Sequence, residues 1–130
     1  VVPDGLFVLE VPGDGPTEWK VYHHALEVDR GNTTGRYGKD GNRDWRHKVE
    51  AYTAYYHSGK YQARYGTPAL RVLTVTTGER RLAHLKDVTE RAGGRTRFLF
   101  TTFERLTPGA ALSEPVWIAA TRTEPQPLFE

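Results

Sequence analysis

The chain has 130 residues, of which 38% are hydrophobic and 26% charged, and its formal net charge at pH 7 is +2. This length lets one domain bury a core without cross-links. The absence of cysteine excludes disulfides, thiolate metal sites and a thiol nucleophile, and no apolar run approaches the ~18 residues that a membrane helix needs. We therefore expect a cytoplasmic domain with no membrane partner.

The charge is unevenly distributed. Residues 30–64 hold eight basic and three acidic side chains, a balance of +5, whereas the rest of the chain holds ten basic and thirteen acidic ones, a balance of −3. A basic segment beside a mildly acidic body is typical of a polyanion partner such as DNA, and an ordinary solvated face is the alternative.

Two β-prone runs come first in the chain. Residues 6–11 form one, residues 19–29 form the other, and the turn residues Gly13-Asp14-Gly15-Pro16 between them predict a hairpin. Residues 31–42 contain four glycines and almost no aliphatic side chains, which predicts an exposed loop beside the end of the second strand.

The next elements alternate between helix and strand. Helical spacing of Trp45, Val49, Tyr52 and Tyr56 predicts a helix over 44–58, capped by Asp44 and ended by Gly59. Residues 70–77 are rich in β-branched side chains and predict a central strand. Residues 79–92 predict a second helix and residues 97–101 a short strand, so this part should form a parallel β-helix-β unit.

The tail contains one further apolar patch, Val116-Trp117-Ile118, and then Pro125 and Pro127, which indicate a chain end without regular structure. The predicted order is strand, strand, helix, strand, helix, strand. It predicts an α/β domain with a mixed sheet flanked by helices, formed by residues 1–108. Residues 109–130 are expected to be an extension that packs on this domain or trails from it.

Three carboxylates can converge at one end of the predicted hairpin. Asp4 precedes the first strand, and Glu27 and Asp29 lie two positions apart near the end of the second, so their side chains project from one sheet face. Oxygen ligands of this kind suit Mg²⁺ or Mn²⁺. The alternatives are a plain Pro-Asp-Gly turn and a solvated strand end in which Asp29 pairs with Arg30.

The motifs resemble those of known families. Pro3-Asp4, then Glu27-Val28-Asp29 on the next strand, then a helix carrying Lys48 and Tyr52, resemble the PD-(D/E)xK nuclease superfamily, which has the restriction-endonuclease-like fold. The blocks PDG, LEVDRG, KVEAYTAYYHSGKYQARYG and LRVLTVTTGERRLAHL, in this order, are similar to the carboxy-terminal part of the replication-relaxation family of plasmid replication and copy-number control.

The resemblance implies roles for individual residues. Asp4 and Glu27 would coordinate the metal, and Asp29 takes the place where active nucleases usually carry a lysine. Lys48, on the same helical face as Tyr52, would supply that cation from the helix. The family pattern also implies a first helix and strand, and a winged-helix-like DNA-binding region, ahead of this sequence. Because the sequence starts at Val1 and contains no methionine, we expect it to be part of a longer protein.

Further candidates are basic and aromatic residues for nucleic acid, namely Arg30, Arg36, Lys39, Arg43, Arg46, Lys60, Arg64 and Tyr61. His23 shares the face of Glu27 and Asp29, where a histidine–carboxylate metal site is conceivable beside a packed strand histidine. Arg80 and Arg81 open the second helix, where a phosphate could bind.

Two classes of function follow. In the first, the chain is a metal-dependent endonuclease domain that cuts or nicks DNA through Asp4, Glu27, Asp29 and Lys48. In the second, it is a catalytically inactive nuclease-fold module that binds DNA or protein in replication control, because Asp29 replaces the usual lysine.

Overall fold

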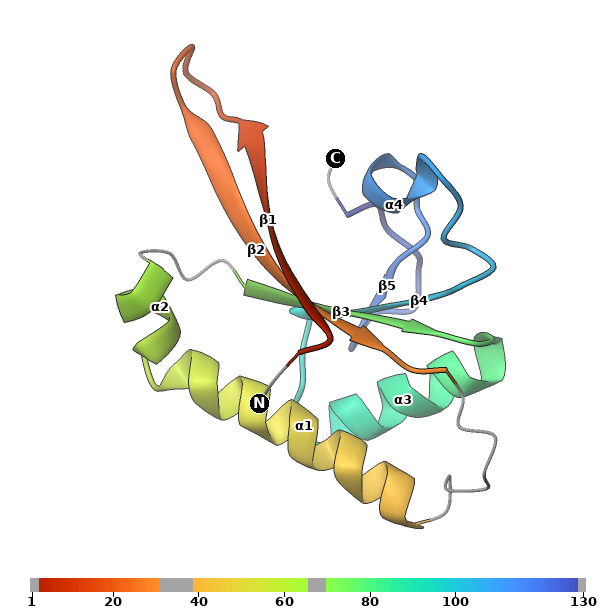
Figure 1. The fold of residues 1–130 in the computed structure, drawn as a ribbon. Coiled ribbons are helices and arrows are strands. Elements are labelled where there is room, and N and C mark those ends of the chain that lie inside the picture. Colours follow the sequence, from red (N-terminus) through yellow and green to blue (C-terminus); the bar gives the residue numbers. More distant parts are fainter. Residues whose placement is uncertain (1–2, 31–38, 66–69, 129–130) are drawn as a thin grey trace.

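The computed structural model describes residues 3–30, 39–65 and 70–128, and of residues 39–43 it describes the backbone alone. Figure 1 shows the elements in chain order. They are β1 (Gly5–Pro12), β2 (Trp19–Val28), α1 (Lys39–His57), α2 (Lys60–Tyr65), β3 (Leu70–Thr76), α3 (Glu79–Arg91), β4 (Phe98–Thr102), α4 (Ala110–Ser113) and β5 (Ile118–Ala119).

The strands form one five-stranded mixed sheet in the order β1-β2-β3-β4-β5. β1 and β2 are the predicted antiparallel hairpin, and the pairs β2–β3 and β3–β4 are parallel. The prediction that the hairpin and the crossover unit share one sheet is therefore confirmed. α1 and α2 form the crossover from β2 to β3, and α3 forms the crossover from β3 to β4. The tip of the hairpin projects away from the rest of the sheet (Figure 1).

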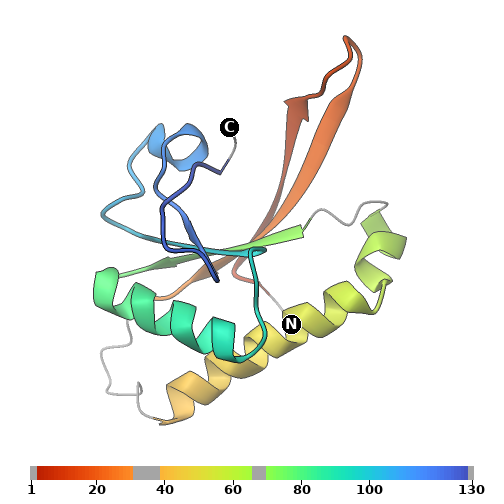
Figure 2. The same cartoon turned by 180° about the vertical axis from the view of Figure 1, so that it is seen from behind.

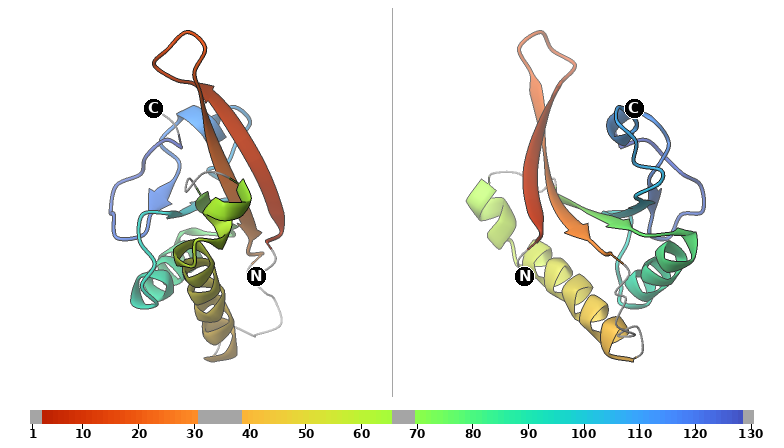
Figure 3. Two further views of the ribbon diagram at one scale, coloured as in Figure 1. Left: turned by 90° about the vertical axis from the view of Figure 1, so that its left-hand side faces the viewer. Right: turned by 45° about the vertical axis from the view of Figure 1, so that its right-hand side comes forward.

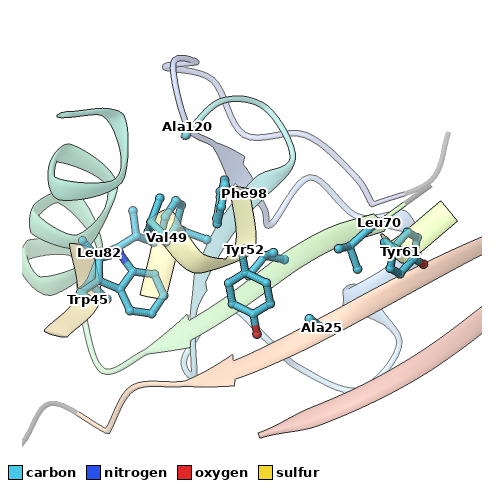
Figure 4. Close-up of a cluster of buried hydrophobic side chains, with 12 residues drawn as sticks. Ala25, Trp45, Val49, Tyr52, Tyr61, Leu70, Leu82, Phe98 and Ala120 are labelled. Atoms are coloured by element: carbon cyan, nitrogen blue, oxygen red, sulfur yellow. The ribbon is translucent and has the colours of Figure 1, made fainter. Parts of the chain in front are cut away.

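α1 and α3 cover one face of the sheet, and α4 with the carboxy-terminal segment lies on the other (Figures 2 and 3). The core under the helices takes Trp45, Val49 and Tyr52 from α1 (Figure 4). These three positions recur every three or four residues, which places them on one stripe that faces the sheet. Leu82 of α3 and Phe98 of β4 complete this layer. The helical periodicity of the sequence thus selects the buried face.

The carboxy-terminal segment is part of the folded domain. Ile118 and Ala119 form β5 against β4, and Trp117 pairs with Gln126 in an isolated antiparallel bridge. Trp117 and Leu128 of this segment are 2% and 3% exposed. They belong to a second cluster of buried hydrophobic side chains, which joins the segment to the sheet. The predicted lack of regular structure is confirmed for the described residues beyond β5, apart from this bridge, but the segment does not unravel, because Trp117 and Leu128 bury apolar area.

The first helix differs most from its prediction. α1 begins at Lys39 rather than Asp44, so Lys39–Asn42 are helical and not part of a loop, while 31–38 lie outside the described residues. Gly59 ends α1 with a φ of +78°, a left-handed conformation that favours glycine, and the short helix α2 follows it. No helix in the described part of the chain is long and apolar enough to cross a membrane.

Candidate functional site

The amino end of β1 lies beside the carboxyl end of β2. Gly5 pairs with Leu26, so Asp4 lies next to Glu27 in the continuation of the antiparallel register. Oδ2 of Asp4 accepts the backbone N–H of Val28 at 2.8 Å. The prediction that Asp4 approaches the end of the second strand is confirmed, and the exposed carboxylate of Asp4 borders the buried one of Glu27.

Glu27 is 2% exposed and receives one donor on each carboxylate oxygen. Nζ of Lys48 lies 2.8 Å from Oε1, and the hydroxyl of Tyr52 donates to Oε2 at 2.5 Å. A buried carboxylate costs several kcal/mol of stability unless it is paired and hydrogen-bonded, so these two donors keep Glu27 in the fold. The side chain of Lys48 is 37% exposed, which leaves its ammonium in reach of a ligand.

Local sequence explains this convergence. Lys48 and Tyr52 are four residues apart and lie on the same face of α1, as predicted, and that face packs on β2. Burial and the neighbouring Glu27 raise the pKa of Tyr52 above its ordinary value, so its hydroxyl remains a donor at every working pH. Glu27 is therefore held in one orientation beside a lysine.

Asp29 belongs to a different network. Its Oδ2 accepts a hydrogen bond from Thr76 Oγ1 at 2.6 Å and from Nε of Arg81 at 3.0 Å, and the Arg81 guanidinium also reaches Oδ1 at 3.4 Å. The ion pair of Asp29 is therefore with Arg81, which is 52 positions away, and the alternative of a pair with Arg30 is wrong. At the start of α3, where a phosphate was predicted to bind, the Arg81 guanidinium is instead paired with the carboxylate of Asp29.

The carboxylates thus divide into two groups. Asp4 and Glu27 share the Lys48 side of the strand end, and Asp29 is neutralised on the Arg81 side. Among the residues that the structure describes, no group of three or more His, Cys, Asp or Glu side chains is arranged to hold a metal ion. The predicted three-carboxylate arrangement is therefore replaced by a pair of carboxylates with a lysine.

The predicted nucleic-acid contacts have different outcomes. The side chains of Arg30, Lys60 and Arg64 are exposed, and that of Arg46 is exposed with a loose 3.8 Å ion pair to Glu50. Arg36 lies outside the described residues, and the side chains of Lys39 and Arg43, although they belong to α1, are not described. The exposed basic residues of the segment belong to the end of β2 and to the two crossover helices.

The prediction for Tyr61 is wrong. Tyr61, the second residue of α2, is 2% exposed, and its ring packs against the rings of Tyr65 and His23, with centroid separations of 5.0 and 5.5 Å. The ring cannot stack on a base while it fills this part of the core. His23 is itself 7% exposed and packs edge-on against these tyrosines, so it is a packed strand histidine.

Sequence reasoning missed Thr76 and Arg81 as the partners of Asp29. The signal lies in the parallel pairing of β2 with β3, because Val28 is in register with Val75 and the residues that follow both strands therefore meet. Recognising α1 as a crossover would have placed Asp29 beside Thr76 and the start of α3.

Comparison of the chain with protein-family models, with curated proteins and with solved structures finds no match.

Proposed function

We propose that this chain is a nuclease-like domain of a replication-relaxation-type protein, in which Asp4, Glu27 and Lys48 form a centre for metal-dependent hydrolysis of DNA phosphodiesters. The observation that carries the proposal is the 2.8 Å ion pair between Glu27 and Lys48 at the strand end beside Asp4. It unites two acids from a hairpin with a lysine from the following helix, which is the residue set of the PD-(D/E)xK pattern with the lysine moved to the helix.

The order of elements supports the same assignment. A hairpin is followed by a crossover helix, a parallel strand, a second crossover helix and a further parallel strand, as the restriction-endonuclease-like fold implies after its first helix and strand. Glu27 lies at the carboxyl end of β2, and Asp4 lies beside it, just before β1. Ligand sites of open α/β sheets are common at such strand ends.

The charge of the centre suits a divalent cation. Asp4 and Glu27 contribute −2 and Lys48 contributes +1, a balance of −1 that Mg²⁺ or Mn²⁺ would convert to +1. The carboxylate of Asp4 is exposed and Lys48 is partly exposed, so the hard oxygen ligands of Asp4 and Glu27 fit such an ion. When bound, the cation would polarise the scissile phosphate and lower the pKa of a bound water molecule.

The side chains of the chain would supply the remaining functions. Lys48 can stabilise negative charge that develops on the phosphate, because its ammonium is fixed before the substrate arrives. Tyr52 holds the carboxylate of Glu27 and prevents it from rotating away from Asp4. Arg81 removes the charge of Asp29, which would otherwise repel the phosphate at the same strand end.

A second function is favoured by the pairing of Asp29. This residue takes the place of the usual lysine and is already neutralised by Arg81 and Thr76. If Lys48 cannot replace the missing lysine, the domain is a non-catalytic DNA- or protein-binding module with the same fold.

One assay separates the two functions. Supercoiled and linear DNA are incubated with the protein and Mg²⁺ or Mn²⁺, beside the variants Asp4→Asn, Glu27→Gln and Lys48→Met. Cleavage should fall ~100-fold or more in each variant, the size of effect seen when a preorganised group is removed from a catalytic site. The controls Asp14→Asn and Lys20→Met remove exposed charges in the hairpin turn and on β2 and should retain cleavage.

Cation binding gives an independent measurement. Titration calorimetry with Mn²⁺ should detect binding by the parent and a loss of binding in Asp4→Asn, with circular dichroism confirming that the variant is folded. A parent protein that binds DNA but neither binds Mn²⁺ nor cleaves would contradict the nuclease proposal and support the non-catalytic module.

A further inference from the structure

A cleft of 830 Å³ opens where β3 and β4 begin. Its walls come from the start of β3, from the turn that precedes β4 and from residues 122–126 of the carboxy-terminal segment. Arg71, the second residue of β3, lies in this cleft, whereas Thr76 at the other end of the same strand binds Asp29. At ~3.3 Å per strand residue, the cleft and the Asp29 network are ~17 Å apart along β3. It is thus a separate feature of the molecule.

Arginine dominates the lining of the cleft. Arg71, Arg95, Arg97 and Arg122 contribute +4 and Glu124 contributes −1, which leaves a balance of +3. Like charges gathered in one concave surface repel one another and oppose folding, and low-dielectric walls concentrate their field. The arrangement becomes favourable when an anion enters, and a concentration of guanidinium groups is the usual way to recognise phosphate.

Two of the arginines are anchored before any ligand arrives. Nη1 of Arg71 donates to the backbone carbonyl of Leu128 at 2.6 Å, and its guanidinium lies 5.4 Å from the centre of the Tyr22 ring. The Arg97 guanidinium lies over the Tyr56 ring at 3.2 Å. Burial lowers the pKa of Arg71, yet a guanidinium remains charged at neutral pH. Anchoring reduces the entropy that these side chains would lose on binding.

The other two arginines are placed to reach a ligand. Arg95 and Arg122 are exposed and come from the turn before β4 and from the segment after β5. With the anchored pair, they surround the cleft from three separate parts of the chain. Such a distribution suits successive phosphates along a strand better than one small ion, because each guanidinium can take a different phosphate.

We propose that the cleft formed by Arg71, Arg95, Arg97 and Arg122 binds the phosphodiester backbone of a nucleic acid. This site lies at the beginning of β3, whereas Asp29 binds Thr76 at the other end of that strand, and it contains none of Asp4, Glu27 and Lys48. It does not rest on the proposed catalytic centre. It would hold a nucleic acid through charge and backbone shape, independently of base sequence.

The test is a binding titration in EDTA, which removes divalent cations and with them any cleavage. Fluorescence anisotropy measures the affinity of the parent for labelled 20-nucleotide single strands and 20-base-pair duplexes over a range of salt concentrations. The double variant Arg95→Ala/Arg122→Ala should bind at least ~10-fold more weakly. Its salt dependence on duplex DNA should be shallower by about 2 in the slope of log K against log salt, because two phosphate contacts are lost.

The matched control is Lys20→Ala/Arg91→Ala, which removes the same charge from exposed positions on β2 and α3 outside the cleft. This control should stay within twofold of the parent. Arg95→Lys/Arg122→Lys keeps the charge and should recover part of the affinity. Thermal unfolding of each variant checks the fold, and the exposed pair is chosen because Arg71 and Arg97 also hold neighbouring elements.

Competition with ATP and with inorganic phosphate tests whether the cleft binds a small phosphate-containing ligand instead of a nucleic acid. Competition by ATP or phosphate should require concentrations far above those of the oligonucleotide. The proposal is overturned if the parent does not bind DNA at low salt, or if the cleft variant and the control bind it equally. It is also overturned if the cleft variant loses ATP binding and keeps DNA binding, since the cleft would then be a nucleotide pocket. None of these results depends on cleavage.

Discussion

Tyr52 of α1 donates its hydroxyl hydrogen to a carboxylate oxygen of Glu27 on β2 at 2.5 Å, across 25 residues of sequence. Both side chains are buried, with exposed fractions of 4% and 2%. The contact joins the first crossover helix to the strand that carries the proposed catalytic acid. This hydrogen bond therefore links α1 to the sheet and also orients the proposed catalytic acid.

Tyr52→Phe removes this hydrogen bond and leaves one oxygen of a buried carboxylate without its donor. We expect the free energy of unfolding to fall by about 1.5–3 kcal/mol, the usual size for a hydrogen bond to a charged group. Urea unfolding measures the change. Tyr55→Phe, on the same helix, serves as the control and should cost less. Equal losses in the two variants would show that the hydrogen bond to Glu27 does not add to the free energy of unfolding.

Asp29→Asn removes the charge opposite Arg81 and should lower the free energy of unfolding by about 1–3 kcal/mol, because both partners are mostly buried, with 18% and 15% of their side chains exposed. In an Arg81→Met background the same substitution should cost much less. A double-mutant cycle in urea isolates the coupling. Additive losses would mean that the ion pair does not stabilise the fold.

His24 should make the fold sensitive to acid. Burial, together with the nearby charges of Arg71 and His23, lowers the pKa of this fully buried imidazole from 6.5 to about 4 in the folded chain. Between these values the unfolded chain binds a proton that the folded chain does not, so stability falls as the pH decreases from 6.5 towards 4. The loss reaches at most about 3 kcal/mol at 1.36 kcal/mol per pKa unit.

The measurement for His24 is urea unfolding at several pH values in this window. His24→Phe keeps a ring stacked on Phe7, whose centroid lies 4.9 Å from that of His24, and should remove most of the dependence. His47→Gln replaces an exposed histidine and should keep it. A His24→Phe protein with an unchanged pH profile would assign the acid sensitivity to other groups.

Gly94→Ala should destabilise the turn between α3 and β4. An added Cβ would lie 2.4 Å from Cγ2 of Thr89 and 3.0 Å from its backbone oxygen, so the turn must shift. We expect a loss of about 1–3 kcal/mol in the free energy of unfolding, as for other overpacked sites. Gly78→Ala, whose Cβ would meet nothing within 4 Å, is the control for thermal unfolding. Similar melting temperatures for both variants would contradict the close packing at Gly94.

The sequence by itself determined the elements and the contacts that depend on one element or one hairpin. Alternation and helical spacing located β1, β2, β3, α3 and β4 to within a residue or two at each end. The hairpin predicted that Asp4 approaches the end of β2, and the four-residue spacing predicted that Lys48 and Tyr52 share a helical face. These relationships follow from backbone periodicity over a few residues, which the amino-acid pattern records directly.

The tertiary structure decided which partner each of these side chains meets. It brought Lys48 to Glu27, Arg81 to Asp29, Tyr61 into the core and four separate arginines into one cleft. Contacts such as these depend on strand order, on the parallel register of β2 with β3 and on the return of the carboxy-terminal segment to the sheet. Local periodicity does not predict these contacts, because they arise only when elements far apart in the sequence bury their apolar faces together.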